Sequence, residues 1–97
     1  MAYKVVVLDL VLLELEDAVD WYSKISDELS KDILEKYIEA LNKIQDKPLL
    51  NPEIKGKYRK INLDRFPYKL VYKIFSTEIL IVAIAQHKRK PGYWRKR

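Results

Sequence analysis

The 97-residue chain contains no cysteine, two glycines and one histidine. The absence of cysteine excludes disulfides, thiolate metal ligands and cysteine nucleophiles, and it disfavours a small secreted domain held together by bridges. Because Gly56 and Gly92 stand far apart, there is no glycine-rich loop to bind a nucleotide phosphate, which excludes kinase, P-loop and Rossmann proteins. A single histidine, His87, does not form a structural zinc site without cysteine. We therefore expect neither a metal nor a cofactor.

The sequence also lacks a long hydrophobic run. The apolar stretch that starts at Val5 ends at Asp9, and the stretch that starts at Leu10 ends at Glu14, so we predict neither a signal peptide nor a membrane span. The composition, with 48% hydrophobic and 34% charged residues, is that of a folded globular protein. We expect one domain over residues 1–97, located in the cytoplasm and without a membrane partner.

Acidic side chains are scarce in the second half of the chain. Residues 1–50 hold 6 basic and 11 acidic side chains, whereas residues 51–97 hold 13 basic and 3 acidic ones, which gives net charges of −5 and +10. Such asymmetry attracts a polyanion or an acidic protein surface and accelerates association. Six of the basic side chains lie in the tail, residues 87–97. We therefore expect the basic half to meet the partner.

The first half of the chain predicts one strand and two helices. Residues 3–8 are β-branched and apolar, which favours a buried strand, and Asp9 is placed to cap the helix that follows. Apolar residues then recur at spacings of three and four over 9–25 and again over 29–46, which is typical of amphipathic helices. Ser26 supplies a capping side chain, and the short connection makes the two helices an antiparallel hairpin. We predict that three aromatic residues anchor this hairpin to the sheet and that four acids form its solvated face: Trp21, Tyr22 and Tyr37, and Glu14, Glu16, Asp17 and Asp20, respectively.

The second half of the chain predicts three strands. Pro48 and Pro52 end helical structure, because proline lacks the amide hydrogen and drives its predecessor into an extended conformation. Strands are predicted at about 57–63, 66–75 and 79–86, and the turns between them are short enough for antiparallel hairpins.

The pattern within these strands predicts how they are arranged. In the middle strand Lys69 and Lys73 mark the more solvated face. The last strand is apolar on both faces, which favours a central position in the sheet. The fold class is therefore α+β in the order β-α-α-β-β-β, with an N-terminal strand and an antiparallel helix hairpin packed on one face of a mainly antiparallel sheet.

Basic and aromatic residues interleave in the second half of the chain. Lysine and arginine neutralise phosphates, and aromatic rings stack on unpaired bases, so this pattern suits nucleic acid. The same residue types are the favoured anchors of protein interfaces, and that alternative stays open. We predict that seven of these residues contact the target: Lys60, Lys69, Lys73, Lys88, Lys90, Trp94 and Arg95.

The chain resembles the RelE/ParE toxin superfamily over nearly its whole length. The resemblance lies in the helix segment 16–22, the pair Tyr58-Arg59, the strand 66–72 (Phe-Pro-Tyr-Lys-Leu-Val-Tyr) and the segment 87–94 (His-Lys-Arg-Lys-Pro-Gly-Tyr-Trp), taken in this order. It implies the toxin component of a type II toxin–antitoxin system, a plasmid stabilisation or addiction system that arrests growth. It also implies a cognate antitoxin as partner, and the assembly is expected to be a homodimer or a toxin–antitoxin hetero-oligomer.

The superfamily implies two different toxic actions. RelE-like members cleave messenger RNA on the ribosome, whereas ParE-like members inhibit DNA gyrase without being nucleases. Asp64 stands where RelE-like nucleases tend to carry a basic residue, and this departure, with Phe66-Pro67-Tyr68 and the basic ending that starts at His87, favours the ParE-like action. The alternatives are a RelE-like, metal-independent mRNA endoribonuclease and a non-toxic nucleic-acid-binding or interaction module. Whether the chain is an enzyme therefore stays open.

Four residues are candidates for catalysis only if the chain is a ribonuclease. Cleavage requires a 2′-hydroxyl to lose a proton and cations to stabilise the charge that builds up on the phosphate. Arg59 and Arg89 then hold the phosphate, and His87 or Tyr93 moves the proton, since imidazole titrates near neutral pH. Two of these residues also have structural alternatives. His87 closes a strand by bonding to a carbonyl, and Arg59 forms an ion pair with a helix acid such as Glu16.

Overall fold

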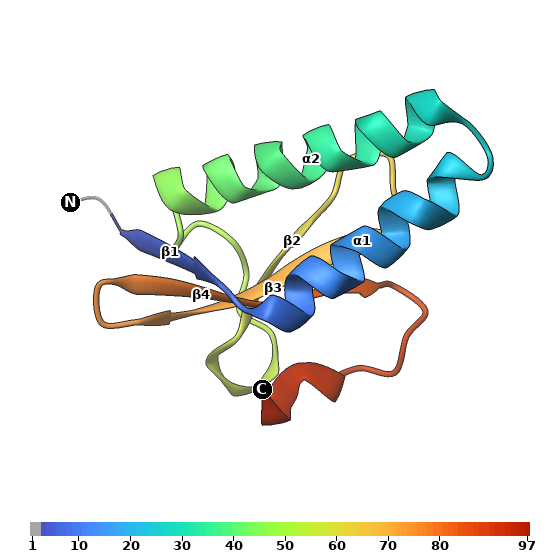
Figure 1. Cartoon of the computed structure of the whole chain (residues 1–97). Helices are drawn as coiled ribbons and strands as arrows, with labels where there is room; N and C mark the ends of the chain where they lie inside the picture. Colours follow the sequence, from blue (N-terminus) through green and yellow to red (C-terminus); the bar gives the residue numbers. More distant parts are fainter. Residues whose placement is uncertain (1–2) are drawn as a thin grey trace.

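The structure is a computed structural model that describes residues 3–97, and it has the predicted order of elements (Figure 1). The elements are β1 (Lys4–Val7), α1 (Asp9–Ser23), α2 (Asp27–Asp46), η1 (Lys55–Lys57), β2 (Arg59–Asn62), β3 (Tyr68–Phe75), β4 (Glu78–Gln86) and η2 (Tyr93–Lys96). The order confirms the α+β fold class. The short 3-10 helices η1 and η2 were not predicted from the sequence pattern.

The strands form one mixed sheet in the order β1-β4-β3-β2. β4 pairs antiparallel with β3, β3 pairs antiparallel with β2, and β1 pairs parallel with β4. The central position predicted for the last strand is therefore confirmed. β1 pairs with β4 only as far as Ile81, so within residues 3–97 the rest of that edge of β4 has no neighbouring strand.

Helices α1 and α2 pack as an antiparallel pair on one face of the sheet, and the main core lies between them and the strands (Figure 1). Ser26 caps α2 as predicted, because its hydroxyl oxygen accepts hydrogen bonds from the amides of Glu28 and Leu29. Asp9, by contrast, is the first residue of α1, and Leu8 is the N-cap. Of the helices in residues 3–97, none is long and apolar enough to cross a membrane.

The opposite face of the sheet is covered by the tail, which folds back across the strands (Figure 1). Trp94 in η2 packs with Tyr58, Val71 and Val82 in a second, smaller core. As predicted, the lysine-bearing face of β3 is the more solvated one, since Lys69 and Lys73 are half-buried and Phe75 is exposed, but the tail covers part of this face. An antiparallel sheet with helices on one side normally leaves its other side to water, but here an irregular segment from a distant part of the chain covers it.

The aromatic residues predicted to anchor the hairpin have different environments. Tyr37 is buried in the main core, and Tyr22 packs edge-on against Phe66 with 5.0 Å between ring centroids. Trp21 is 60% exposed, so the anchoring role predicted for it is wrong. Its neighbour Tyr22 continues the inward-facing stripe of α1, and one helical position turns a side chain by about 100°. This stripe runs through Val11, Leu15 and Ala18.

Candidate functional site

Glu14 of α1 holds the tail in place. Its carboxylate, 13% exposed, accepts hydrogen bonds from the backbone amide of Ile84 at 3.2 Å and from the guanidinium of Arg97 at 2.9 and 3.3 Å. The phenol of Tyr93 donates to the same carboxylate. The interpretation of the helix acids as a solvated face is therefore wrong for Glu14, although Glu16, Asp17 and Asp20 are exposed as predicted.

Glu14 and Arg97 take the place of a strand at the open edge of β4. Beyond Ile81 this edge lacks the pairing that β1 provides before it. Glu14 accepts from the amide of Ile84, and the guanidinium of Arg97 donates to the carbonyl of Val82 at 2.9 Å. A buried backbone group without a partner costs about 1–3 kcal/mol. The ion pair therefore satisfies two polar groups that the end of β1 leaves unpaired.

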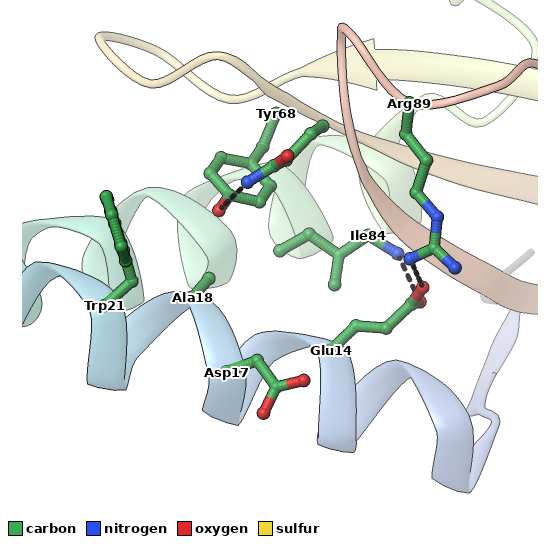
Figure 2. Close-up of a pocket in the computed structure, with 8 residues that line it drawn as sticks. Glu14, Asp17, Ala18, Trp21, Tyr68, Ile84 and Arg89 are labelled. Atoms are coloured by element: carbon green, nitrogen blue, oxygen red, sulfur yellow. Dashed lines mark hydrogen bonds and ion pairs between the residues drawn. The ribbon is translucent and has the colours of Figure 1, made fainter.

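Two arginines of the tail share the ring of Tyr93. The guanidinium carbon of Arg89 lies 3.8 Å from the centroid of this ring, and that of Arg97 lies 5.1 Å from it. Arg89 also forms an ion pair with Glu14 at 3.6 Å, and Figure 2 shows its side chain directed towards this carboxylate. Gly92, at a φ of 82°, turns the chain into η2 just before Tyr93. These contacts fix the direction of the tail.

The phenol of Tyr93 is held in its neutral form. Burial raises its pKa above the usual 10.0, and the hydrogen bond to Glu14 and the negative charge of that carboxylate raise it further. The positive charges of Arg89 and Arg97 lower the pKa but do not offset these effects. A phenol with so high a pKa is a poor base for a 2′-hydroxyl near neutral pH, because few of the molecules carry the phenolate.

Three of the residues predicted to bind the target share the second face of the sheet. Lys69 and Lys73 flank Val71 on β3, and Lys60 of β2 is paired with Val71. All three lysines are half-buried, and the ammonium of Lys73 lies 5.6 Å from the ring centroid of Tyr58. The ammonium of Lys69 likewise lies over an aromatic ring, that of Trp94. The structure thus gathers them on the side that the tail covers.

Trp94 is buried instead of facing a partner. It is 4% exposed and packs edge-on against Tyr58 and Tyr93, with centroid distances of 6.5 and 5.3 Å. The ammonium of Lys69 lies 5.7 Å from its ring. Within residues 3–97 the indole N–H of Trp94 finds no hydrogen-bond partner. In this position Trp94 packs the tail against the sheet. Its ring is not exposed for the target contact that was predicted from the sequence.

The other predicted residues of the tail are exposed to solvent. These are His87, Lys88, Arg89, Lys90 and Arg95. The backbone amide of His87 donates to the carbonyl of Pro67 at 2.9 Å, which keeps the start of the tail next to the turn that precedes β3. The tail is therefore fixed through Tyr93, Trp94 and Arg97, while the cations before and between them remain accessible.

Arg59 lies apart from these cations. It is paired with Tyr72 on β3 and therefore faces the helix side of the sheet, since residues directly opposite each other point to the same face. Its guanidinium donates to the carbonyls of Leu49 at 3.3 Å and Asn51 at 2.6 Å, and it lies 4.0 Å from the carboxylate of Glu53. An ion pair was predicted with a helix acid, and this prediction is wrong because the acid is Glu53.

The four residues predicted for RNA cleavage are thus brought together only in part. Arg89 contacts Tyr93, and His87 lies two residues before Arg89. Arg59 is paired with Tyr72 of β3, whereas Gln86, which ends β4 just before the tail, is paired with Tyr68. Tyr68 and Tyr72 are four residues apart along β3, or about 13 Å at 3.3 Å per residue. Because β3 separates the edge strand β2 from β4, Arg59 does not share a phosphate site with Arg89.

An open pocket of about 300 Å³ lies between α1 and the end of β4 (Figure 2). Its lining is mixed: the carboxylates of Glu14 and Asp17 lie on one side, Arg89 on the other, and the exposed ring of Trp21 at one end. Sequence reasoning did not find this pocket, since its residues come from α1, β3, β4 and the tail. Trp21 was the one available signal, because it stands one position outside the apolar stripe of its helix.

Solved structures that share this arrangement include the following three. The chromosomal ParDE system from P. aeruginosa matches at 18% identity over 88% of this chain and 96% of that chain, with a TM-score of 0.77. A double mutant of the E. coli toxin RelE in the free state matches at 19% identity over 91% and 86%, with a TM-score of 0.65. The isolated E. coli RelE toxin matches at 18% over 98% and 95%, with a TM-score of 0.61. At these identities the likeness establishes the fold. A search of curated proteins finds no match.

The family follows from the sequence. The model of a family described as the ParE toxin of the type II toxin–antitoxin system parDE matches residues 5–91. The match spans most of the chain, so the protein belongs to this family and to the RelE/ParE superfamily that its motifs resemble. Membership makes it the toxin of a type II pair, and it implies an antitoxin as partner.

Proposed function

We propose that this toxin arrests growth by inhibiting DNA gyrase and that its action does not involve cleavage of RNA. Membership in the ParE family supports this choice, because ParE-like members of the superfamily act on gyrase. The likeness to RelE concerns the fold and does not favour the ribonuclease.

The main support for gyrase inhibition over RNA cleavage is that the candidate catalytic residues are not gathered at one site. A ribonuclease needs a base and phosphate-binding cations around one reacting centre, held within hydrogen-bonding reach. Here Arg59 donates to loop carbonyls on the helix side of the sheet, and Tyr93 is a neutral donor to Glu14. His87 and Arg89 remain, and both are exposed to solvent, so they lack the enclosure that such a site requires.

The cations of the second face and the tail are proposed as the surface that meets the target. They comprise Lys60, Lys69, Lys73, Lys88, Lys90 and Arg95, with Arg89 at the edge of the pocket. One-sided positive charge of this kind raises the rate of association with an acidic surface. The same charges suit an acidic antitoxin segment, which would cover them and block access to the target.

The experiment separates the two toxic actions in one culture. The chain is expressed from a tightly repressed promoter with and without its antitoxin, and growth, gyrase supercoiling by the purified toxin, and primer extension on cellular mRNA are measured. We expect growth arrest, loss of supercoiling and no codon-phased cuts. Codon-phased cuts with normal gyrase activity would show the ribonuclease instead, and unaffected growth would favour a non-toxic module.

A charge-reversal variant tests the proposed surface. Lys88→Glu with Lys90→Glu is expected to weaken gyrase inhibition at least about tenfold, because both side chains are exposed and steer the encounter. The matched control is Lys24→Glu with Lys31→Glu, which makes the same charge change at exposed positions of the helices. Equal inhibition by the two variants would contradict the assignment of the tail.

A further inference from the structure

The loop between α2 and β2, residues 47–53, displays two adjacent leucines to solvent. Leu49 is 64% exposed and Leu50 is 76% exposed, the largest exposed fraction of any large apolar side chain in residues 3–97. A single exposed leucine is common on protein surfaces and needs no explanation. Two adjacent ones at the tip of a loop are worth examining if the backbone that carries them is fixed.

The backbone of this loop is fixed by polar side chains of the sheet. The phenol of Tyr72 is fully buried and donates to the carbonyl of Pro48 at 2.6 Å, and it accepts from the side-chain amide of Asn51 at 3.1 Å. Arg59 donates to the carbonyls of Leu49 and Asn51, as described above. The backbone that carries the two leucines is therefore held by side chains of the sheet.

Further hydrogen bonds close both ends of the loop. The amide of Leu50 donates to the carbonyl of Lys47 at 3.2 Å, and the amide of Lys60 donates to the carbonyl of Pro52 at 3.4 Å. A segment whose backbone is already ordered loses little conformational entropy on binding, so its apolar contacts contribute more fully to affinity. The loop is thus preorganised for contact.

The surroundings of the leucines are cationic. Leu50 lines a recess with Ile61 between the end of α2 and the edge strand β2. Lys43 and Lys47 line the same recess with one acid, Asp46, and Lys55 and Lys57 follow the loop in the sequence. This composition fits a partner surface with an apolar pocket and an acidic rim.

We infer that the Leu49-Leu50 loop is the apolar anchor by which the toxin docks into a pocket of its folded target. A rigid, protruding pair of side chains must be received by a concavity, which a folded protein provides. This inference rests on the proposed function, because it names the surface with which the toxin contacts the protein that it inhibits.

The test compares matched variants of the full chain, purified from the complex with its antitoxin. The leucine variant carries Leu49→Ser and Leu50→Ser, and the control is Phe75→Ser, which removes one apolar side chain of 69% exposure at the β3–β4 turn. Gyrase inhibition, growth arrest, antitoxin affinity and thermal unfolding are measured for each. Tyr72→Phe, which keeps both leucines but deletes the hydroxyl that holds Pro48, provides a second readout of the loop.

We expect the leucine variant to inhibit gyrase at least about tenfold more weakly, since a few buried anchor residues contribute most of the affinity of an interface. Antitoxin affinity and unfolding temperature should match those of the Phe75→Ser control, and Tyr72→Phe should show a smaller loss of inhibition. Unchanged inhibition would overturn the inference, as would a loss of antitoxin affinity. If the native toxin leaves gyrase unaffected, the proposed function fails by itself, and growth arrest by the same variants still tests the loop.

Discussion

Two irregular segments of this toxin are each held against the sheet by one charged side chain, and they use that side chain in opposite ways. In the loop 47–53 the guanidinium of Arg59 donates to backbone carbonyls, so Leu49 and Leu50 are left free. In the tail the carboxylate of Glu14 accepts hydrogen bonds from the side chains of Tyr93 and Arg97, so these two side chains are not available to a partner. A charged group that binds the backbone of a segment leaves the side chains of that segment free to contact a partner. A charged group that binds side chains removes those side chains from such contacts.

The largest expected effect comes from removing Glu14. Glu14→Ala leaves the guanidinium of Arg97 without its carboxylate in a site where both are mostly buried, and breaking such a pair costs about 3 kcal/mol or more. Urea unfolding measures the loss. In a Trp21→Phe background Trp94 is the sole tryptophan, and its emission should shift to that of a solvated indole as the tail detaches. The exposed neighbour Glu16→Ala should change stability by less than about 0.5 kcal/mol.

A smaller effect is expected at the loop. Tyr72→Phe removes the hydroxyl that donates to Pro48 and accepts from Asn51, which costs about 1–3 kcal/mol because a buried carbonyl loses its donor. Amide exchange should accelerate at residues 49–51 and stay unchanged in the tail. Exchange that accelerates equally in both segments would show that they are not held independently, and the contrast between them would lose its basis.

The smallest effect concerns the pH dependence of the contact between Tyr93 and Glu14. Because the pKa of Tyr93 is raised in the folded state, its contribution is complete below pH 10 and decreases as the pH rises towards the folded-state pKa. Below pH 10 Tyr93→Phe should be less stable than the native toxin by about 1 kcal/mol. The difference should narrow above pH 10, where the unfolded native chain ionises. A difference that stays constant with pH would contradict the proposed neutral donor.

Local sequence patterns were sufficient to predict the α-helices and the strands but not the polar contacts between distant residues. The helices α1 and α2, the cap at Ser26 and the central β4 follow from spacing, capping and apolar character, which act over a few residues. Glu14 and Arg97 are 83 positions apart, and their pairing depends on where β1 ends beside β4. A periodic pattern of apolar residues contains no information about a contact between residues so far apart in the sequence. Glu14 was therefore interpreted as a solvated acid.

The candidate site was predicted in composition and only partly in geometry. The segments around Lys69, Lys73 and the tail were correctly singled out as the basic and aromatic part of the chain, and Lys60, Lys69 and Lys73 do share a face. Arg59 was grouped with the tail because they share a residue type, yet the pairing of β2 with β3 places it on the helix side. Trp94 was expected at the surface because it stands among cations.

The order of apolar spacings, turn residues and basic motifs in this sequence determined the α+β fold and the membership in the ParE toxin family, since these are properties of short segments read in series. The tertiary structure alone decided which charged groups are occupied and which are free. The physical reason is that buried polar groups need hydrogen-bond partners. Glu14 finds such partners in the tail and Arg59 in the loop 47–53, and these segments come next to them only when the chain folds.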